Sequence, residues 1–553
     1  MFFRVVHRKH GQSKYRYLHL VESYRDPAKA GRPRQRLIHS FGNIAHISED
    51  QRRRLVSSLS RALGLEVSSP ELTTLDTRHF GDLLALRSLW EELELPAQIS
   101  RLTAARKVNF DVEVVAFLMV AHRLIDPGSK LALTRWLPTA YLEGYDLDTI
   151  QVQHCYRALD LLDEIAPEIE EGLFVRLSNL FERELSLVFY DLTSSYFEGD
   201  GPTDAAYGYS RDKRPDQKQI VIALAVDRRG LPITHLTFGG NRTDQKTLDE
   251  AVAHLKERFQ IVRTIFVADG GVMSEANIEH LTSSGYQHLI ALPKKRARAR
   301  ELAAGIEWTM NDAVGENVMA RLVTCADTPG IKYLVCYNPE RAEQEVQIRD
   351  ARLGKVTDAL ESLQRQVTAG RLKDRDKILA SAVGTLARLR ARRYFEVHSR
   401  ADAQFQFHLR QEAVSSQAAL DGYYFLQTDA TELEACEILD AYKTLQRVEH
   451  AFRELKDTIQ LRPIYHYDDA RVRGHIFVCM LAYLLARLLE LRLEAAGRPL
   501  SAKAAMEALE PVRVVRNRLD ERVIDCVVQC RPPDADVVLR ALGLLPLPVA
   551  IES

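Results

Sequence analysis

Three acidic residues lie in sequence settings that suit metal-assisted chemistry. Asp191 lies in the run LSLVFYDLTSS, Asp269 in RTIFVADGG, and Glu449 in YKTLQRVEHAFRELK. The two aspartates end runs that predict strands, and strand ends at one edge of an α/β sheet are where such folds place their chemistry. Three carboxylates would hold one or two Mg²⁺ ions, and two such ions can stabilise the attacking and leaving oxygens during phosphodiester cleavage.

Each of these acids also has an ordinary structural explanation. An aspartate after a strand is often a turn or cap residue, and a glutamate on an amphipathic helix often belongs to a solvated charged face. Asp269 follows Asp191 by 78 positions, and Glu449 follows Asp269 by 180. Only folding can bring them together, so their joint meaning depends on the elements that carry them.

The glutamate lies in a stretch, residues 442–456, that contains no helix breaker. Apolar residues recur there at steps of three and four, which predicts one buried stripe of an amphipathic helix: Leu445, Val448, Phe452 and Leu455. Glu449 lies beside this stripe, and Lys456 follows about two turns later on the same side. Cations surround the glutamate, so the helix could serve a metal and a phosphate backbone together: Arg447, Arg453 and Lys456.

The elements that must position these residues form an interrupted core. Residues 181–293 begin with three predicted strands and continue with strands that alternate with helices, which predicts a mixed α/β core. The core resumes at 431–500 with the helix that carries Glu449. Between the two parts, residues 294–430 predict an α+β insertion with a sheet of its own and a long polar helix.

Two regions precede this core and one follows it. Residues 1–48 predict short strands and carry ten Lys or Arg against two acids. This excess suits contact with a phosphate backbone, and a merely solvated basic surface explains it equally well. Residues 49–180 carry helical periodicity and are expected to be a helical DNA-binding or linker region. Residues 501–553 are expected to form a tail of strands and a short helix.

Composition excludes several other classes of protein. The net charge of the 553 residues is −1, so any nucleic-acid surface must be local. Seven scattered cysteines without a paired spacing are typical of a reducing cytosol and do not suggest a zinc site. The N-terminus lacks the apolar run of a secretion signal. Residues 476–493 are apolar but interrupted by charges, which predicts a buried helix and no membrane span.

Taken together, these segments resemble the DDE transposases of bacterial insertion sequences, in the branch whose third motif reads Y-x2-R-x3-E-x6-K. Tyr442, Glu449 and Lys456 match that spacing. The resemblance spans most of the chain and includes further stretches: YGYSRDKRPDQKQIVIALAVDRRGLPI, GGNRTDQKTL, VCYNPERA and RPIYHY. It implies a ribonuclease-H-like catalytic core with an insertion between the second Asp and the Glu, which agrees with the order of elements above.

The resemblance assigns roles to particular residues. By position, it implies that Asp191, Asp269 and Glu449 form a catalytic triad that binds Mg²⁺, for which Mn²⁺ can substitute. It also implies that Tyr442 and Lys456 contact the phosphates of the element end.

At one position the chain departs from the motif. Leu445 occupies the arginine position, and Arg447 lies about 200° around the helix from it, so it cannot simply replace that arginine. In the same branch, an aromatic residue on the preceding strand can stack on a flipped base while a hairpin forms. Tyr424 is the candidate for this role, and ordinary core packing is its alternative.

The expected function is a cut-and-paste transposase that cleaves DNA at the ends of its element and transfers the strand to a target, through a hairpin that only the family branch implies. Its expected partners are double-stranded DNA, as terminal inverted repeats and as target, and a second copy bound with it as a homodimer. The expected location is the bacterial cytoplasm, at the nucleoid. One alternative is a domesticated transposase that binds DNA but no longer cuts. Another is a related nuclease that hydrolyses DNA without strand transfer.

Several other polar residues are explained by ordinary roles. His235 and His466 lie in apolar, strand-like settings where satisfied core or surface histidines are common. Ser194 and Ser195 follow Asp191, but nothing in the sequence supports a serine nucleophile. The basic run at 294–300 is expected to be a solvated face.

Overall fold

The computed structural model describes most of the 553 residues. It does not describe residues 11–12, 27–31, 45–46, 65–71, 182–186, 243, 262–263, 269–273, 295–296, 315–316, 400–403, 520–521 and 552–553. Inside helices and strands, some side chains are also outside the description, among them those of residues 446–451. The chain divides into two compact units, residues 1–76 with 516–525 and 552–553, and residues 77–515 with 526–551.

The first unit begins with the three strands predicted in its basic segment. They form an antiparallel sheet in the order β1-β2-β3: β1 (Phe2–His10), β2 (Ser13–Asp26) and β3 (Arg32–Asn43). Arg36 donates to Glu22 across β2 and β3 at 2.7 Å. Helix α1 (Glu49–Ala62) follows, and Ser48 caps it in a reciprocal capping box with Gln51, which satisfies two otherwise unpaired N–H groups.

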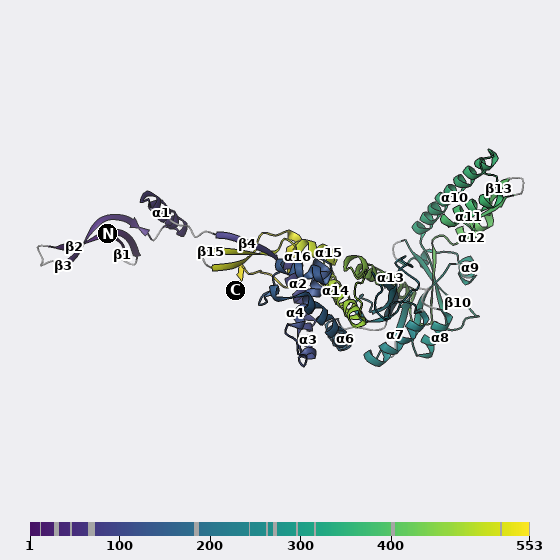
Figure 1. The fold of residues 1–553 in the computed structure, drawn as a ribbon, viewed down its shortest axis with the longest axis horizontal. Coiled ribbons are helices and arrows are strands. Elements are labelled where there is room, and N and C mark those ends of the chain that lie inside the picture. Colours follow the sequence, from purple (N-terminus) through teal and green to yellow (C-terminus); the bar gives the residue numbers. More distant parts are fainter. Residues whose placement is uncertain are drawn as a thin grey trace. The chain divides into compact units, whose positions relative to one another are not determined.

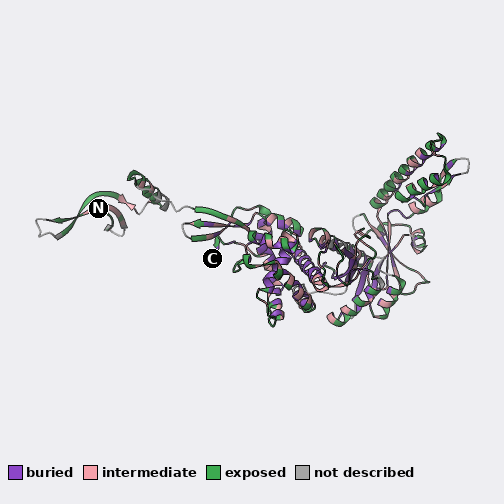
Figure 2. Ribbon diagram, in the orientation of Figure 1, coloured by how far each residue is buried: buried purple, intermediate pink, exposed green. Residues whose placement is uncertain are grey.

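Helices dominate the first part of the second unit, as predicted, and pack around one long buried helix. They are α2 (Gly81–Glu92), α3 (Leu95–Thr103), α4 (Val112–Ile125), α5 (Lys130–Trp136) and α6 (Val152–Phe181), with 3-10 turns η3 (Leu137–Thr139) and η4 (Leu147–Thr149). The long helix, α14 (Asp469–Ala495), is buried along most of its length (Figure 2). No described helix is both long enough and apolar enough to cross a membrane.

The centre of the second unit is an eight-stranded mixed sheet. Its order is β10-β11-β14-β9-β8-β5-β6-β7. The strands from its early part are β5 (Leu187–Tyr196), β6 (Gln219–Val226), β7 (Pro232–Gly239), β8 (Ile265–Ala268) and β9 (Gln287–Leu292). β5 pairs antiparallel with β6 and parallel with β8, and β8 pairs parallel with β9. The mixed α/β core predicted from the sequence is confirmed.

Helices cover both faces of this sheet because strand side chains alternate between them. Val188 and Tyr190 pack into one core with helices α7 (Asp244–Phe259) and α8 (Glu275–Ser283). Phe189 and Val267 belong to the other core, to which α13 (Ala435–Arg453) contributes. The helix that carries Glu449 therefore lies on the sheet face to which Phe189 points.

The expectation that residues 294–430 have a sheet of their own is only partly right. Three of their strands extend the central sheet instead, because β9 offers a free strand edge on which β14 pairs: β10 (Met319–Thr324), β11 (Lys332–Tyr337) and β14 (Tyr423–Thr428). Only β12 (Phe395–Ser399) and β13 (Phe405–Leu409) form a separate two-stranded sheet.

Helices complete the inserted segment. These are α9 (Ala297–Ala304), η5 (Met310–Asp312), α10 (Pro339–Thr368), α11 (Arg375–Arg388) and α12 (Gln411–Ala418). The long polar helix α10 packs by one apolar stripe, Val356, Leu360, Leu363 and Val367, into a core shared with α11, and the two lie side by side in Figure 1. This confirms the predicted long polar helix.

The C-terminal segment adds helices and strands of another sheet. Its elements are α15 (Ala502–Leu509), β15 (Arg513–Leu519), β16 (Arg522–Val527), α16 (Pro533–Ala541) and β17 (Ala550–Ile551). The strands form a four-stranded sheet in the order β17-β16-β15-β4. Strand β4 (Leu72–His79) comes from a region that the sequence predicts to be mostly helical.

Candidate active site

Asp191 lies in the middle of β5 and does not end it, because the strand continues to Tyr196. The sequence prediction of a strand end is therefore wrong by five residues. Asp191 is half-buried, and its Oδ1 accepts a hydrogen bond from the Leu192 N–H at 2.8 Å. Among the described residues, the parallel pairing of β5 with β8 extends to Phe189, opposite Val267. Asp191 lies two residues further along β5.

The two other expected triad carboxylates cannot be placed. Asp269 lies outside the described residues and follows directly after the last residue of β8, Ala268. Glu449 lies on α13, but its side chain and that of Arg447 are outside the description. The described side chains do not include these two carboxylates. Among the described side chains, no group of three His, Cys, Asp or Glu could hold a metal ion.

Leu445 is a core residue of α13. It is 4% exposed and packs in the same apolar cluster as Phe189 and Val267. An arginine there would bring a charge into the core, so the departure from the family motif has a packing reason in this chain. Arg453, at the end of α13, is exposed and lies free of the core.

Tyr442 stacks on Tyr424 from the neighbouring strand β14. Their ring centroids lie 6.1 Å apart at an interplanar angle of 23°. Both rings are half-buried, and burial raises the pKa of Tyr424, which keeps its phenol protonated. The structure thus brings two of the sequence-predicted DNA-contact residues together as an aromatic pair.

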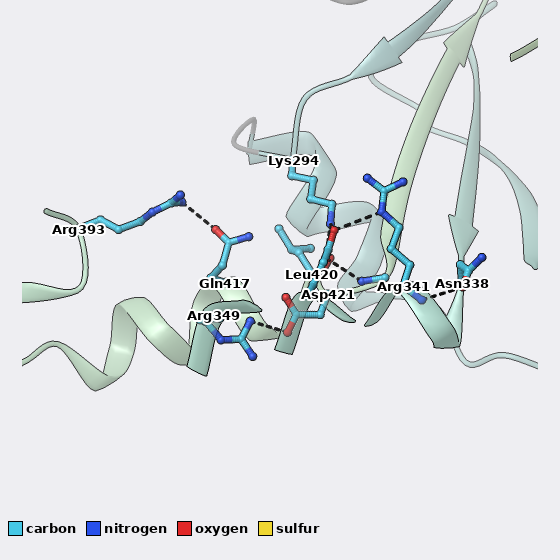
Figure 3. A network of polar contacts seen from close by, with 10 residues as sticks. Lys294, Asn338, Arg341, Arg349, Arg393, Gln417, Leu420 and Asp421 are labelled. Carbon is cyan, nitrogen blue, oxygen red and sulfur yellow. Dashed lines mark hydrogen bonds and ion pairs between the residues drawn. The ribbon is translucent and has the colours of Figure 1, made fainter. Parts of the chain in front are cut away.

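A cationic pocket lies beside this tyrosine pair. Its volume is about 460 Å³ and its lining includes both tyrosines together with five basic side chains: Lys294, Arg341, Arg349, Arg352 and Arg393. Figure 3 shows Lys294 and Arg349 among their partners, with Lys294 donating to the Leu420 carbonyl at 3.0 Å and Arg349 to Asp421 at 2.5 Å.

The basic residues of this pocket were not predicted from the sequence as a site. Lys294 belongs to the basic run that is expected to be a solvated face, yet it reaches Glu345 of α10 at 2.8 Å. Arg341 and Arg349 lie on the same helix at a spacing of eight, which places them on one face. That spacing could have indicated a basic face on this helix, but no pattern in the sequence indicates that this face lies beside Tyr424 and Tyr442.

Lys456 is held in an ion pair and is largely buried. Its Nζ lies 2.7 Å from Oδ1 of Asp212, and the two side chains are 11% and 2% exposed. Arg462 also pairs with Asp212 and donates to Asp457 at 2.8 Å. Burial lowers the pKa of Lys456, and the neighbouring Asp212 partly offsets that effect.

The segment that carries Lys456 is a π-helical turn. After α13 ends at Arg453, the turn η6 (Glu454–Thr458) begins, and the Ile459 N–H donates to the Glu454 carbonyl at 2.9 Å. A π-turn shifts the angular position of each following residue relative to an α-helix. The backbone at Lys456 therefore does not continue the regular α-helical spacing that the sequence predicts.

Comparisons with known sequences identify the class of protein that carries this site. Residues 182–485 match the transposase DDE domain, more than half of the chain, so the protein belongs to the DDE transposases. Residues 3–69 match the N-terminal domain of IS1634 family transposases. The protein is therefore, more particularly, a DDE-type transposase of an insertion sequence.

Two solved structures illustrate how far known folds overlap with this chain. A piggyBac transposase synaptic complex with hairpin DNA aligns at 10% identity and a TM-score of 0.35, over 78% of this chain and 79% of that one. A Mos1 transposase paired-end complex with the left transposon end aligns at 16% identity and a TM-score of 0.15, over 47% and 71%. These TM-scores are too low to carry an argument. Comparison with curated proteins gave no match.

Proposed function

We propose that Asp191, Asp269 and Glu449 form the catalytic triad of a ribonuclease-H-like core. This centre would cleave DNA at the inverted repeats that bound the element and transfer the strand to a target. The observation that carries the proposal is the position of Asp191 beside the end of β8, on a strand whose Phe189 packs toward α13.

The strand register supports this grouping. Leu187 pairs with Ile265 and Phe189 pairs with Val267, so two further residues along each strand lead to Asp191 and to Asp269. Side chains two apart on a strand share a face. Asp191 thus shares the face of Phe189, which is the face that α13 covers. Glu449 is on α13, four residues after Leu445 of the same core.

A set of carboxylates fits a hard divalent cation, Mg²⁺ or in its place Mn²⁺. When bound, such an ion supplies charge stabilisation at the reacting phosphodiester. The protein's part would be to hold the three carboxylates around such an ion. Asp191 contributes from inside β5, where backbone pairing on the β6 side restrains it.

The surroundings of the site suit a nucleic-acid backbone. The cationic pocket beside Tyr424 and Tyr442 offers charge and an aromatic pair at the same place. Phosphates and bases are bound by this combination of groups. In this proposal Tyr442 contacts the DNA end and Tyr424 stacks on a base during a hairpin step. Arg447 and Arg453 supply further charge, and Lys456 joins them when Asp212 releases it.

The N-terminal segment is proposed to recognise the element ends. Most side chains of β1 and β3 are exposed, and these strands carry six of the ten Lys and Arg of residues 1–48. Phosphate contacts of this kind fix the register of a protein on DNA. Because two ends must be cut together, two copies are proposed to act as a dimer on DNA.

The triad is tested with a charge-removing substitution that keeps shape. Glu449→Gln should reduce Mg²⁺-dependent cleavage of an end-labelled duplex at least about 100-fold, the scale of losing one electrostatic stabiliser. End binding in a mobility-shift assay should persist. Asp440→Asn, an exposed acid on the same helix, is the matched control and should cut normally. Cleavage by Glu449→Gln at the original rate would show that the triad is assigned wrongly.

A further inference from the structure

A second cationic cavity lies among α4, α5, α6 and the segment that follows η6. Its volume is about 470 Å³, within the range of small-ligand sites. Eleven residues line it, and none of them is acidic. Its basic side chains are Arg123, Lys130 and Arg462, and its aromatic ones include Tyr156 and Tyr465. We refer to it below as the Lys130 cavity.

Two of these cations are buried and have no acidic partner in the described part of the chain. Lys130 and Arg123 are each 5% exposed. The acceptors that the structure describes for Arg123 are neutral, the carbonyls of Gln460 at 3.1 Å and Ile459 at 3.3 Å. Among the described residues, no hydrogen bond or ion pair engages the Lys130 ammonium. A buried cation without a partner is costly, so such groups are ordinarily paired or bind a ligand.

The lowered pKa values of groups in the cavity agree with burial beside positive charges that no acid among the described residues offsets. Burial, with Arg123 next, lowers the pKa of Lys130 to about 7. Burial, followed by Lys130 and Arg123, lowers the pKa of His466 to about 4. The other groups that act on Lys130 are the thiols of Cys155 and Cys479, and burial raises the pKa of both, so neither is an anion at neutral pH.

The other basic residue of the cavity differs from these two. The charge of Arg462 is already offset by Asp212 and Asp457. Arg471, close by, is likewise paired with Asp160 at 2.9 Å. Among the described residues, acids thus pair with the neighbouring arginines but not with Lys130 or Arg123, so an anion from outside the protein would fit beside these two cations.

We propose that the Lys130 cavity binds a phosphate group of the DNA backbone, with Lys130 and Arg123 as its ligands. The cavity adjoins the catalytic helix, since Arg123 holds the carbonyls of the two residues that follow η6. Tyr465 lines the cavity and is 62% exposed, so an aromatic ring lies where the cavity meets solvent. Cations with an exposed aromatic ring are the combination that tracks a nucleic-acid strand. This inference rests on the proposed function of cleaving DNA.

Salt dependence of DNA binding tests the contact. The probe is a labelled duplex of about 30 base pairs without a metal ion, titrated between about 50 and about 200 mM salt. Lys130→Met keeps the length of the side chain and removes its charge. It should lower the slope of log K against log salt by about one, the loss of one phosphate contact. Lys503→Met removes a lysine that is 70% exposed and should leave the slope as in the wild type. An unchanged slope for Lys130→Met would overturn the proposal.

Thermal unfolding separates a binding role from a structural one. Without an added oxyanion, Lys130→Met should melt at or above the wild-type temperature, because an unpaired buried charge has been removed. A melting temperature several degrees lower would mean that Lys130 is paired within the protein and would overturn the proposal. Neither the salt dependence of DNA binding nor the comparison of melting temperatures requires cleavage. Both measurements therefore test the cavity even if Glu449→Gln shows that the triad is assigned wrongly.

Inorganic phosphate distinguishes the two sources of the anion. At constant ionic strength, phosphate in place of chloride should raise the melting temperature of the wild type in a saturable way, and not that of Lys130→Met. If phosphate stabilises only the wild type while the DNA slope is the same in both proteins, the cavity binds a free oxyanion and the assignment to DNA is overturned.

Discussion

Leu445 shows how packing overrides a motif at a single residue. The motif that the sequence resembles has an arginine at this position, whereas here the side chain is 4% exposed in the core beneath the sheet. The exposed Arg453, at the end of the same helix, lies outside the core. Leucine in place of the motif arginine therefore lets α13 pack into the core.

Restoring the motif residue should damage the protein. Leu445→Ala should cost about 2–5 kcal/mol of stability, as for other large-to-small core changes, and Leu445→Arg should cost at least as much because it buries a charge. Denaturant unfolding followed by circular dichroism measures both. Lys443→Ala, an exposed change on the same helix, is the control. A stable Leu445→Arg protein that binds DNA more tightly would contradict this explanation.

Glu454 is a residue whose titration should be visible in stability. Burial, with Glu490 next, raises its pKa to about 7, and Arg487 is already paired with Glu490 and Glu494. A folded pKa above the unfolded one gives stability that is complete below the unfolded pKa and is lost as pH rises through about 7. The wild type should therefore lose stability between pH 5 and pH 8 relative to Glu454→Gln.

The comparison of melting temperatures at these two pH values checks this prediction. The difference between Glu454→Gln and the wild type should grow at the higher pH, by about 1 °C for each kcal/mol of lost stability in a unit of this size. A constant difference at both pH values would show that Glu454 does not titrate in this range.

At the scale of elements, the turn η6 is tied to the loop before β6 by one buried acid. Asp212 receives both Lys456 and Arg462, and its side chain is 2% exposed. Removing an acid from a buried pair costs more than replacing the pair, because it leaves cations without a partner. This loop therefore holds the segment that follows α13.

A double-mutant cycle measures this coupling. Asp212→Asn should destabilise by about 3–5 kcal/mol, and the double variant Asp212→Asn with Lys456→Met should lose less than the sum of the two single changes. Asp216→Asn, an acid of the same loop that is 60% exposed, should change stability little. Additive effects of Asp212→Asn and Lys456→Met would show that the two groups are not coupled.

At the scale of the whole molecule, the chain separates into two compact units. The basic sheet β1-β2-β3 pairs only within itself among the described strands. Its removal should therefore leave the core of the second unit intact.

Deletion of residues 1–48 tests this separation. The truncated protein should keep the main melting transition and Mg²⁺-dependent nicking of arbitrary duplex DNA, and should lose its preference for element ends over a scrambled duplex. Mobility shifts with the two duplexes and thermal unfolding provide the measurements. Retained preference for the ends would move end recognition to another part of the chain.

The sequence by itself determined the local features of this protein. Period-two strands, period-three-to-four helices and the spacing of Tyr442, Glu449 and Lys456 are local signals, and they predicted the mixed core, the buried α14 and the family. Only the tertiary structure decided that β10, β11 and β14 extend the central sheet, that Leu445 is a core residue, that Lys456 is paired with Asp212, and that Lys130 and Arg123 share a cavity without an acid. Strand pairing and charge pairing join residues far apart in the chain, and spacing along the sequence carries no record of such partners.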